Sequence, residues 1–368
     1  MPVRLPSVIA IPLEEYRRET HPVLRLHRLC DAMEVLSKFL TVVALGEVRR
    51  QLPGWPLPND LLKVLQPQIE RPTFGQWLAM LLALIDSVAW EKAVLGPAFP
   101  RFVKTHLEPG LWGPQGLVKF RNDLFHGGGI PQAWAREQLT GWDPWLADLL
   151  PHLGFMAEAQ VCYVSQGTAL RLVGPALAGE AMALSPHLAR ELQELNEHVV
   201  LIQGEAWLDL WPLCDYGRAT QATLEGLREA ASASPLVFFR AERQRCLYAA
   251  LGSDLPHGER NDVLKEFLAL FRLRELRQDA ANLIDREQEV KQAKALIGKG
   301  SPNYPNTDPW YDSREEETPG SILAAPREGT YLTVAELEAC LKETATWIKV
   351  GERRRAVDLS FENSQPEG

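Results

Sequence analysis

The residue types best suited to catalysis lie in one short segment, Arg121-Asn122-Asp123-Leu124-Phe125-His126, which three glycines follow. Asn122 and His126 are four residues apart, so a helix places them on one face. Arg121 lies on a neighbouring stripe, from which its long side chain can reach the imidazole. A guanidinium binds phosphate oxygens in a fork, and an imidazole transfers protons near neutral pH. This set suits a phosphodiester, and the glycines leave room for its backbone.

The same spacing occurs a second time, from Arg101 to His106. Prolines at positions 97, 100 and 109 disfavour a long regular helix there. A phenylalanine also follows Arg101, where the other segment has the polar Asn122. We therefore assign the catalytic role to residues 121–126.

Basic residues outnumber acidic ones around this segment. Between Glu91 and Arg121 there are five basic residues and two acidic ones. We expect four of the nearby side chains to bind the substrate: Lys119, Lys104, Arg101 and His106. Two simpler interpretations stay open, namely a solvated basic surface and a pair of cations that caps a helix C-terminus.

Other candidate motifs are weaker. Residues 296–301 contain Gly-Lys-Gly-Ser but lack the upstream glycine of a phosphate loop. His198, Glu205, Asp209 and Asp215 are close in sequence, but polar residues of strands and turns usually face water. The five cysteines are scattered without metal-ligand spacing, so we expect reduced, mostly buried thiols, no metal and no cofactor.

The elements that carry the 121–126 segment are predicted to be helical. Apolar residues from Leu26 to Val43 follow helical spacing, with Gly46 as the expected end. A second helix is predicted from Thr73, which forms a capping box with Gln76, to Lys92. Helices are also predicted over 116–126 and over 142–160, with a break near Pro151. The sequence thus predicts a helical bundle over residues 1–160.

The pattern changes after residue 160. Short apolar runs at 161–164, 169–173, 198–202, 207–211 and 235–239 alternate with glycine and proline, which predicts strands in a small mixed sheet over 161–272. A charged amphipathic helix is predicted over 273–300, then a proline-rich acidic linker over 301–329. A last helix from Thr333 and a loose tail complete residues 330–368. The expected fold class is α+β: an N-terminal helical bundle, a small mixed β-containing domain and C-terminal helices.

The net charge and the apolar content of the chain disfavour a stable duplex-binding protein and a membrane protein. The chain has 368 residues, 46% hydrophobic and 24% charged, with a net charge of −9. An acidic protein of this kind is a poor stable duplex binder, because phosphate binding requires clustered Lys and Arg. A local basic pocket can still act on a nucleic acid transiently. No apolar run reaches membrane-spanning length and the amino terminus lacks a signal pattern, so we expect a cytoplasmic protein with no membrane partner.

The 121–126 segment resembles the signature of HEPN domains, a helical family with an Arg, a polar residue that is often Asn, and a His about four to six residues after the Arg. The resemblance covers roughly residues 10–160. It implies metal-independent endoribonuclease activity, commonly in an effector or toxin of a prokaryotic defence system. It also implies a homodimer in which two motifs face one cleft.

The mechanism that the resemblance implies uses the 2′-hydroxyl of the RNA as nucleophile and leaves 2′,3′-cyclic phosphate ends. His126 is the expected general acid or base, Arg121 stabilises the charged transition state, and Asn122 orients the phosphate or the imidazole. Two alternatives stay open. One is a catalytically inactive HEPN-like dimerisation, interaction or ligand-sensing subunit. The other is a regulator that binds RNA or a small ligand through the middle domain. A regulatory protein partner is compatible with each.

Overall fold

The computed structural model describes residues 4–52, 57–126, 130–223, 226–242, 245–253, 255, 257–260 and 264–271. All of them belong to one compact unit, Met1–Leu273. The helix predicted up to residue 300, the 301–329 linker and the 330–368 helix and tail lie outside the described residues.

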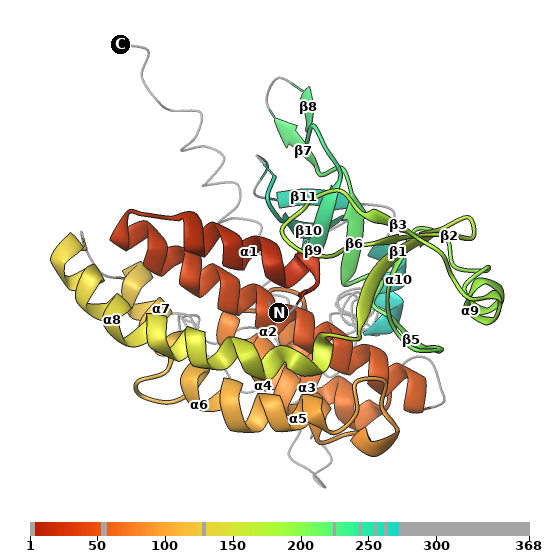
Figure 1. The fold of residues 1–368 in the computed structure, drawn as a ribbon, viewed down its shortest axis with the longest axis horizontal. Coiled ribbons are helices and arrows are strands. Elements are labelled where there is room, and N and C mark those ends of the chain that lie inside the picture. Colours follow the sequence, from red (N-terminus) through yellow and green to blue (C-terminus); the bar gives the residue numbers. More distant parts are fainter. Residues whose placement is uncertain are drawn as a thin grey trace, which may run out of the picture. The chain divides into compact units, whose positions relative to one another are not determined.

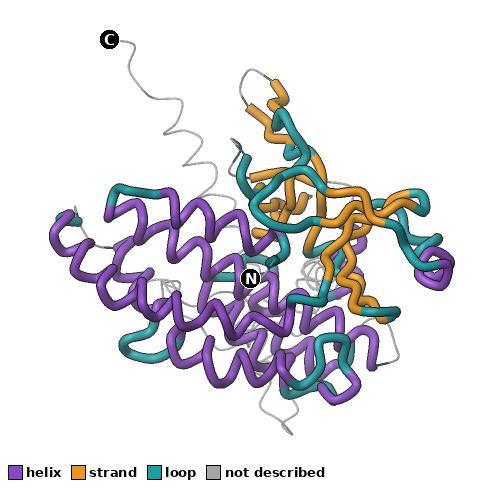
Figure 2. The backbone as a smooth tube through the Cα atoms, in the orientation of Figure 1, coloured by secondary structure: helices purple, strands orange, loops and turns teal. Residues whose placement is uncertain are grey.

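Helices form the first half of this unit, and strands form most of the rest (Figures 1 and 2). The principal helices are α1 (Ser7–Arg18), α2 (Pro22–Gln51), α3 (Asn59–Ile69), α4 (Phe74–Ile85), α5 (Ala98–Phe102), α6 (Glu108–Leu111), α7 (Leu117–His126) and α8 (Gln132–Leu149). The longest is α2, which packs against α1, α4, α7 and α8. The bundle is therefore organised around α2.

Helix α2 extends past Gly46, so the predicted end at this residue is wrong. The helix continues to Gln51. A Cβ on Gly46 would lie 3.1 Å from the backbone oxygen of Asp209 in strand β5 (Ala206–Asp209). Glycine at this position thus permits close helix–strand packing and does not end the helix.

The other predicted helices are present with different limits. The Thr73–Gln76 capping box is confirmed at the start of α4, but α4 ends at Ile85 and only a 3₁₀ turn covers Trp90–Lys92. Helix α8 begins ten residues before its predicted start, at Gln132, and changes near Pro151 into the 3₁₀ segment Leu150–Met156. Residues 98–111 are helical despite their prolines, through a π-helical turn at Val103–Leu107 between α5 and α6.

Two antiparallel sheets follow the bundle, where the sequence predicts one small mixed sheet. The first has the order β3-β2-β1-β4-β5 and the second the order β11-β10-β9-β6. Their remaining strands are β1 (Gln160–Ser165), β2 (Thr168–Arg171), β3 (Glu180–Met182), β4 (His198–Gln203), β6 (Cys214–Gly217), β9 (Ser234–Glu242), β10 (Arg245–Ala250) and β11 (His257–Arg260). Strands β7 (Thr220–Thr223) and β8 (Gly226–Glu229) form a separate hairpin. Neighbouring strands are antiparallel because many of their connections are too short for a parallel crossover.

Two short helices accompany the sheets: α9 (Pro186–Glu191), between β3 and β4, and α10 (Leu264–Leu270), after β11. One hydrophobic cluster runs through the bundle, the second sheet and α10. Trp77 of α4 packs edge-on against Phe238 of β9 at 6.3 Å between ring centroids, and Phe238 stacks on Phe267 of α10 at 4.6 Å. The change near residue 160 is thus a change of secondary structure, and the core continues across it.

The cysteine prediction is confirmed for four residues. Cys30, Cys162, Cys214 and Cys246 are buried free thiols, and Cys340 lies outside the described residues. No group of His, Cys, Asp and Glu within the described part of the chain is arranged to hold a metal ion. None of the described helices combines the length and the apolar content that a membrane crossing requires.

Candidate functional site

Helix α7 carries the predicted catalytic residues and is fixed by its apolar side. Leu117 and Leu124, seven residues apart, are both buried. This spacing places them on one face, and Arg121, four residues after Leu117, lies on the same face. Lys119 and Asp123 are exposed and form an i,i+4 ion pair of 2.8 Å. The Lys119 ammonium is therefore engaged on its own helix.

The side chain of Arg121 lies against α2. Its Nη2 atom is 3.6 Å from Oε2 of Glu34, and the Arg121 side chain is 31% exposed. Oε1 of the same carboxylate is 2.8 Å from Nζ of Lys38, whose side chain is only 4% exposed. Glu34 therefore bridges a half-exposed cation of the predicted site and a buried cation of the core.

Arg121, Glu34 and Lys38 form a charge row, and its buried end, Lys38, reaches the second sheet. Nζ of Lys38 lies 5.2 Å from the ring centroid of Phe239 in β9, a cation–π geometry. Cys30 lies one helical turn before Glu34 and is buried, and burial raises the pKa of its thiol to about 12. The Cys30 thiol thus stays protonated at neutral pH and adds no charge beside Arg121, Glu34 and Lys38.

Sequence reasoning missed Glu34 and Lys38. Their signal was nevertheless present, because two charged residues stand four apart within the apolar stretch from Leu26 to Val43. Charged side chains that are almost fully buried are normally paired, which is the case here. A search for charges inside an apolar helix would have found both.

The other two predicted catalytic residues lie on the same helix as Arg121. Asn122 is exposed and lies four residues before His126. His126 is the last residue of α7, directly before the glycines. The side chain of His126 and residues 127–129 lie outside what the structure describes.

The second Arg–His pair occupies a different place in the bundle. Lys104 forms an ion pair of 2.5 Å with Asp86 at the end of α4. The ring of His106 stacks on His152 at 3.5 Å between centroids, beside the end of α8. Arg101 is exposed on α5. The contacts of Lys104 and His106 thus point to the end of α4 and to the 150–156 segment, whereas Arg121 contacts α2.

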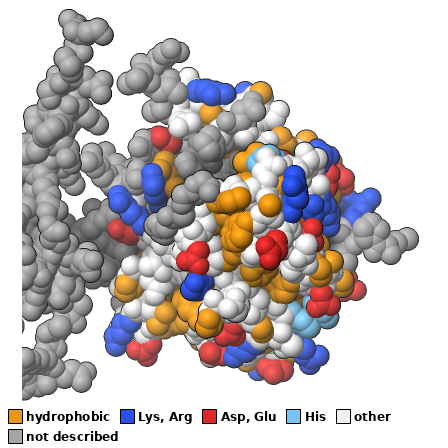
Figure 3. Space-filling model, turned by 90° about the vertical axis from the view of Figure 1, so that its left-hand side faces the viewer, with side chains coloured by type: hydrophobic (Ala, Val, Ile, Leu, Met, Phe, Trp, Pro, Cys, Tyr) orange, Lys and Arg blue, Asp and Glu red, His pale blue; other side chains and the backbone are white. Residues whose placement is uncertain are grey.

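An aromatic row lies beside Arg121, along α7 and α8. Phe120 stacks on Trp134 with ring planes 9° apart and centroids 5.8 Å apart, and it also contacts Trp142. Trp134 is 38% exposed. Figure 3 shows hydrophobic side chains gathered on the face that this end of the bundle presents. The row gives the predicted site an apolar border.

The polar residues of the first sheet form a structural network. Asp209 lies 3.2 Å from Nδ1 of His198 and accepts the backbone N–H of Trp211 at 3.0 Å. Arg49 of α2 donates to Asp209 at 3.4 Å and to the carbonyl oxygen of Trp211 at 3.0 Å. These contacts join the end of α2 to β4 and β5. Asp215 is buried and bonds the adjacent backbone N–H of Tyr216, while Glu205 accepts from Ser185.

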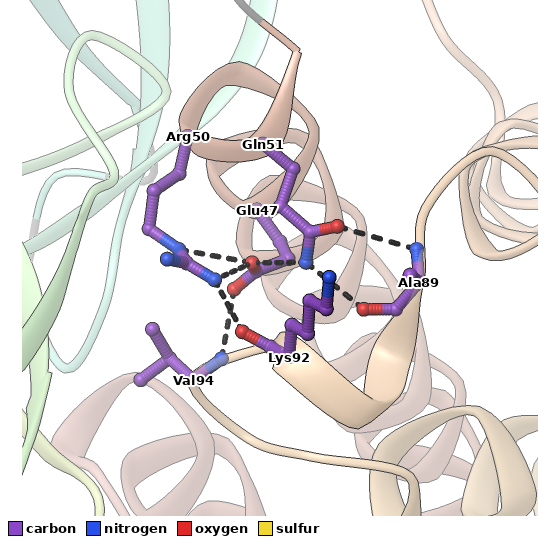
Figure 4. A network of polar contacts seen from close by, with 6 residues as sticks. All are labelled: Glu47, Arg50, Gln51, Ala89, Lys92 and Val94. Carbon is purple, nitrogen blue, oxygen red and sulfur yellow. Dashed lines mark hydrogen bonds and ion pairs between the residues drawn. The ribbon is translucent and has the colours of Figure 1, made fainter.

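A second network fastens the end of α2 to the loop after α4 (Figure 4). Glu47, only 1% exposed, accepts from Nε of Arg50 at 2.9 Å, from Nε2 of Gln51 at 2.7 Å and from the backbone N–H of Val94 at 3.0 Å. Gln51 also exchanges hydrogen bonds with both backbone groups of Ala89. The Glu47 carboxylate is saturated by protein donors, so its role is to hold the 89–94 loop.

Comparison with known proteins adds no assignment to this geometry. No protein-family model matches the chain, and neither the curated proteins nor the solved structures contain a match.

Proposed function

We propose that the chain is a metal-independent endoribonuclease of the HEPN type, an RNA-cleaving effector or toxin of a prokaryotic defence or stress system. The observation that carries the proposal is the placement of Arg121, Asn122 and His126 on α7, with the Arg121 guanidinium held by Glu34. An arginine fixed by a carboxylate is oriented before substrate arrives, which lowers the cost of ordering it in the transition state.

The proposed reaction is a transesterification within the RNA. The 2′-oxygen attacks the neighbouring phosphorus and loses its proton, while the 5′-oxygen of the next nucleotide leaves and takes up a proton. His126 transfers one of these protons, and Arg121 stabilises the added negative charge on the phosphoryl oxygens. Asn122 orients the phosphate or the imidazole. The products are a 2′,3′-cyclic phosphate and a free 5′-hydroxyl.

Two proton transfers favour a pair of sites. A single imidazole cannot readily act as both base and acid within one turnover, so a homodimer that brings two α7 helices together supplies both. Exposed apolar side chains support this arrangement: Leu24 of α2 is 51% exposed and Trp134 of α8 is 38% exposed. The contact of 3.0 Å between His21 and Gln132 shows that the starts of these two helices are adjacent.

The Glu34 contact also favours one alternative. A carboxylate that occupies Arg121 competes with phosphate for the guanidinium, as in an inactive HEPN-like interaction or sensing subunit. The two functions differ in one respect: the nuclease requires Arg121 and His126 for a chemical step, and the interaction module does not.

The deciding experiment is cleavage of single-stranded RNA by the purified full chain in EDTA. We expect cleavage with 2′,3′-cyclic phosphate ends, and a loss of about 100-fold or more in the Arg121→Ala and His126→Ala variants. Arg101→Ala and His106→Ala are the matched controls, because they remove the same residue types at the same spacing from another part of the bundle. Dependence on Mg²⁺, or full activity in both α7 variants, contradicts the mechanism.

A further inference from the structure

A large cleft lies between the bundle and the first sheet, away from α7. Its volume is about 940 Å³, and α1, α8 and the 173–176 loop form its walls. The loop is fastened to the amino-terminal segment, because Gly174 donates its N–H to the carbonyl oxygen of Leu5 and Ser7 donates to that of Leu172. The cleft thus has fixed walls on three sides.

A hydrogen-bonded trio from three helices lines this cleft, and it joins the neutral Tyr16 to the charged Arg25 and Asp143. The Tyr16 hydroxyl donates to Asp143, and Nη2 of Arg25 donates to the same carboxylate at 3.0 Å. The Arg25 guanidinium also lies 4.9 Å from the centroid of the Tyr16 ring. Nε of Arg25 is buried and has no hydrogen-bond partner among the described residues. A buried donor without an acceptor costs free energy, and the protein atoms around this N–H shield it from the cleft.

Two further arginines line the cleft, and their charges are less neutralised. Within the described part of the chain, no ion pair holds Arg17. Glu180 is bonded chiefly by Arg171, and its pKa is lowered mainly by that hydrogen bond and to a smaller extent by Arg4. Arg4 and Arg17 are both exposed. Their guanidinium groups remain able to bind the oxygens of an anion.

Apolar residues supply the rest of the lining. Leu13 of α1, Leu146 of α8 and Leu150 of the following 3₁₀ segment line the cleft, with Val173 and Pro175 from the loop. Apolar walls with a few polar groups are typical of small-molecule sites, and the volume lies at the upper end of their usual range. Inorganic phosphate alone would leave most of this space empty.

We propose that this cleft binds a mononucleotide, with its phosphate against Arg4 and Arg17 and its base between the apolar walls. The site is separate from α7 and does not depend on nuclease activity. It offers a way to sense a ligand, because Arg25 stands on α2 nine residues before Glu34, which holds Arg121.

The test is calorimetric titration of the full chain with AMP, CMP, GMP and UMP in the absence of RNA. We expect saturable binding of at least one nucleotide with a dissociation constant on the order of 10–100 µM, given the usual free energy per ligand atom. Arg17→Gln is expected to weaken binding about 10-fold or more. Arg136→Gln, at an exposed position of α8 outside the cleft, is the control and leaves binding unchanged.

A second pair of variants tests the space without altering charge. Ala147→Trp places a large ring at the cleft and is expected to abolish binding, whereas Ala133→Trp on the exposed start of α8 leaves it intact. Arg121→Ala must retain nucleotide binding, because a product that occupies the nuclease site would lose it. The proposal is overturned if no nucleotide binds up to about 5 mM, a concentration far above the expected dissociation constant. It is also overturned if inorganic phosphate binds as tightly as the nucleotides, or if Arg17→Gln and Arg136→Gln have equal effects.

Discussion

Glu34 and Arg121 form an ion pair of 3.6 Å that connects α7 to the central helix α2. The same carboxylate pairs with Lys38 at 2.8 Å, and Lys38 is almost completely buried. A residue of the proposed site is thereby tied to the core, so substitutions of Glu34 or Lys38 are expected to change the stability of the fold. This connection gives the first prediction.

Glu34→Gln is expected to lower the free energy of unfolding by about 3 kcal/mol, because the ammonium of Lys38 is left buried without a counter-ion. Lys38→Met is expected to cost less, since Glu34 keeps Arg121 and the methionine fills the space. Urea denaturation of both variants measures the difference. A smaller loss in Glu34→Gln than in Lys38→Met contradicts this account of the charge row.

Local signals predicted the start of α4 and five of the eleven described strands, namely β1, β2, β4, β5 and β9, because capping boxes and short apolar runs act over a few residues. The continuation of α2 past Gly46 depends on β5, more than 150 residues later, which no local pattern contains. Likewise, residues 98–111 are helical because a π turn accommodates their prolines, and propensity alone disfavours this. Helix α1 went unpredicted since Pro12 interrupts its pattern.

Gly46 and Gly141 provide a matched test of close packing. Alanine favours a helix interior over glycine by about 0.8–1 kcal/mol. A Cβ on Gly141 meets nothing within 4 Å, so Gly141→Ala is expected to stabilise the protein by nearly that amount. At Gly46 the Cβ meets the Asp209 backbone oxygen at 3.1 Å, and crowding of about 1–3 kcal/mol reverses the sign. Stabilisation by both substitutions in urea denaturation would refute the packing role of Gly46.

The candidate site was predictable only in its local part. Arg121, Asn122 and His126 share a helix because they are close in sequence. The contact with Glu34 required two helices to be placed in space, and the separation of Arg121 from Lys104 and His106 required the whole bundle. A count of charged residues along the chain does not show in which direction each side chain points. Residues that are close in sequence here contact different helices for this reason.

The alkaline stability of the protein is expected to depend on Tyr16. Burial, followed by the hydrogen bond to Asp143, raises the pKa of the Tyr16 hydroxyl from its ordinary value of 10.0 to about 12. The unfolded chain ionises first, so this stability is complete below pH 10 and is lost as pH rises towards 12. The loss is about 2 kcal/mol or less. Between pH 9 and 11, measured by urea denaturation, Tyr16→Phe should lose less free energy of unfolding than the wild type. An equal loss in both proteins would mean that other groups cause the alkaline destabilisation.

The proposed dimer places Leu24 at or near the interface. Leu24→Lys in the full chain is expected to shift the mass measured by light scattering from two chains towards one, because a charge in an apolar interface must be desolvated. Val64→Lys on α3 is the control, since Val64 is also an exposed apolar residue, at 37%. A wild-type chain that is monomeric and still cleaves RNA shows that one motif suffices.

The network around Glu47 gives the last prediction. Glu47→Ala removes the acceptor of Arg50, Gln51 and the Val94 backbone N–H together, and a buried donor left without a partner costs about 1–3 kcal/mol. We expect a loss of about 3 kcal/mol in the free energy of unfolding and faster hydrogen exchange at the Val94 amide. The exposed Glu91→Ala, in the same loop, should change neither quantity measurably. Because Gln51 retains its bonds to Ala89, exchange should increase more at Val94 than at Ala89. Uniform acceleration along 89–94 would instead mean that Glu47 holds the loop as a single unit.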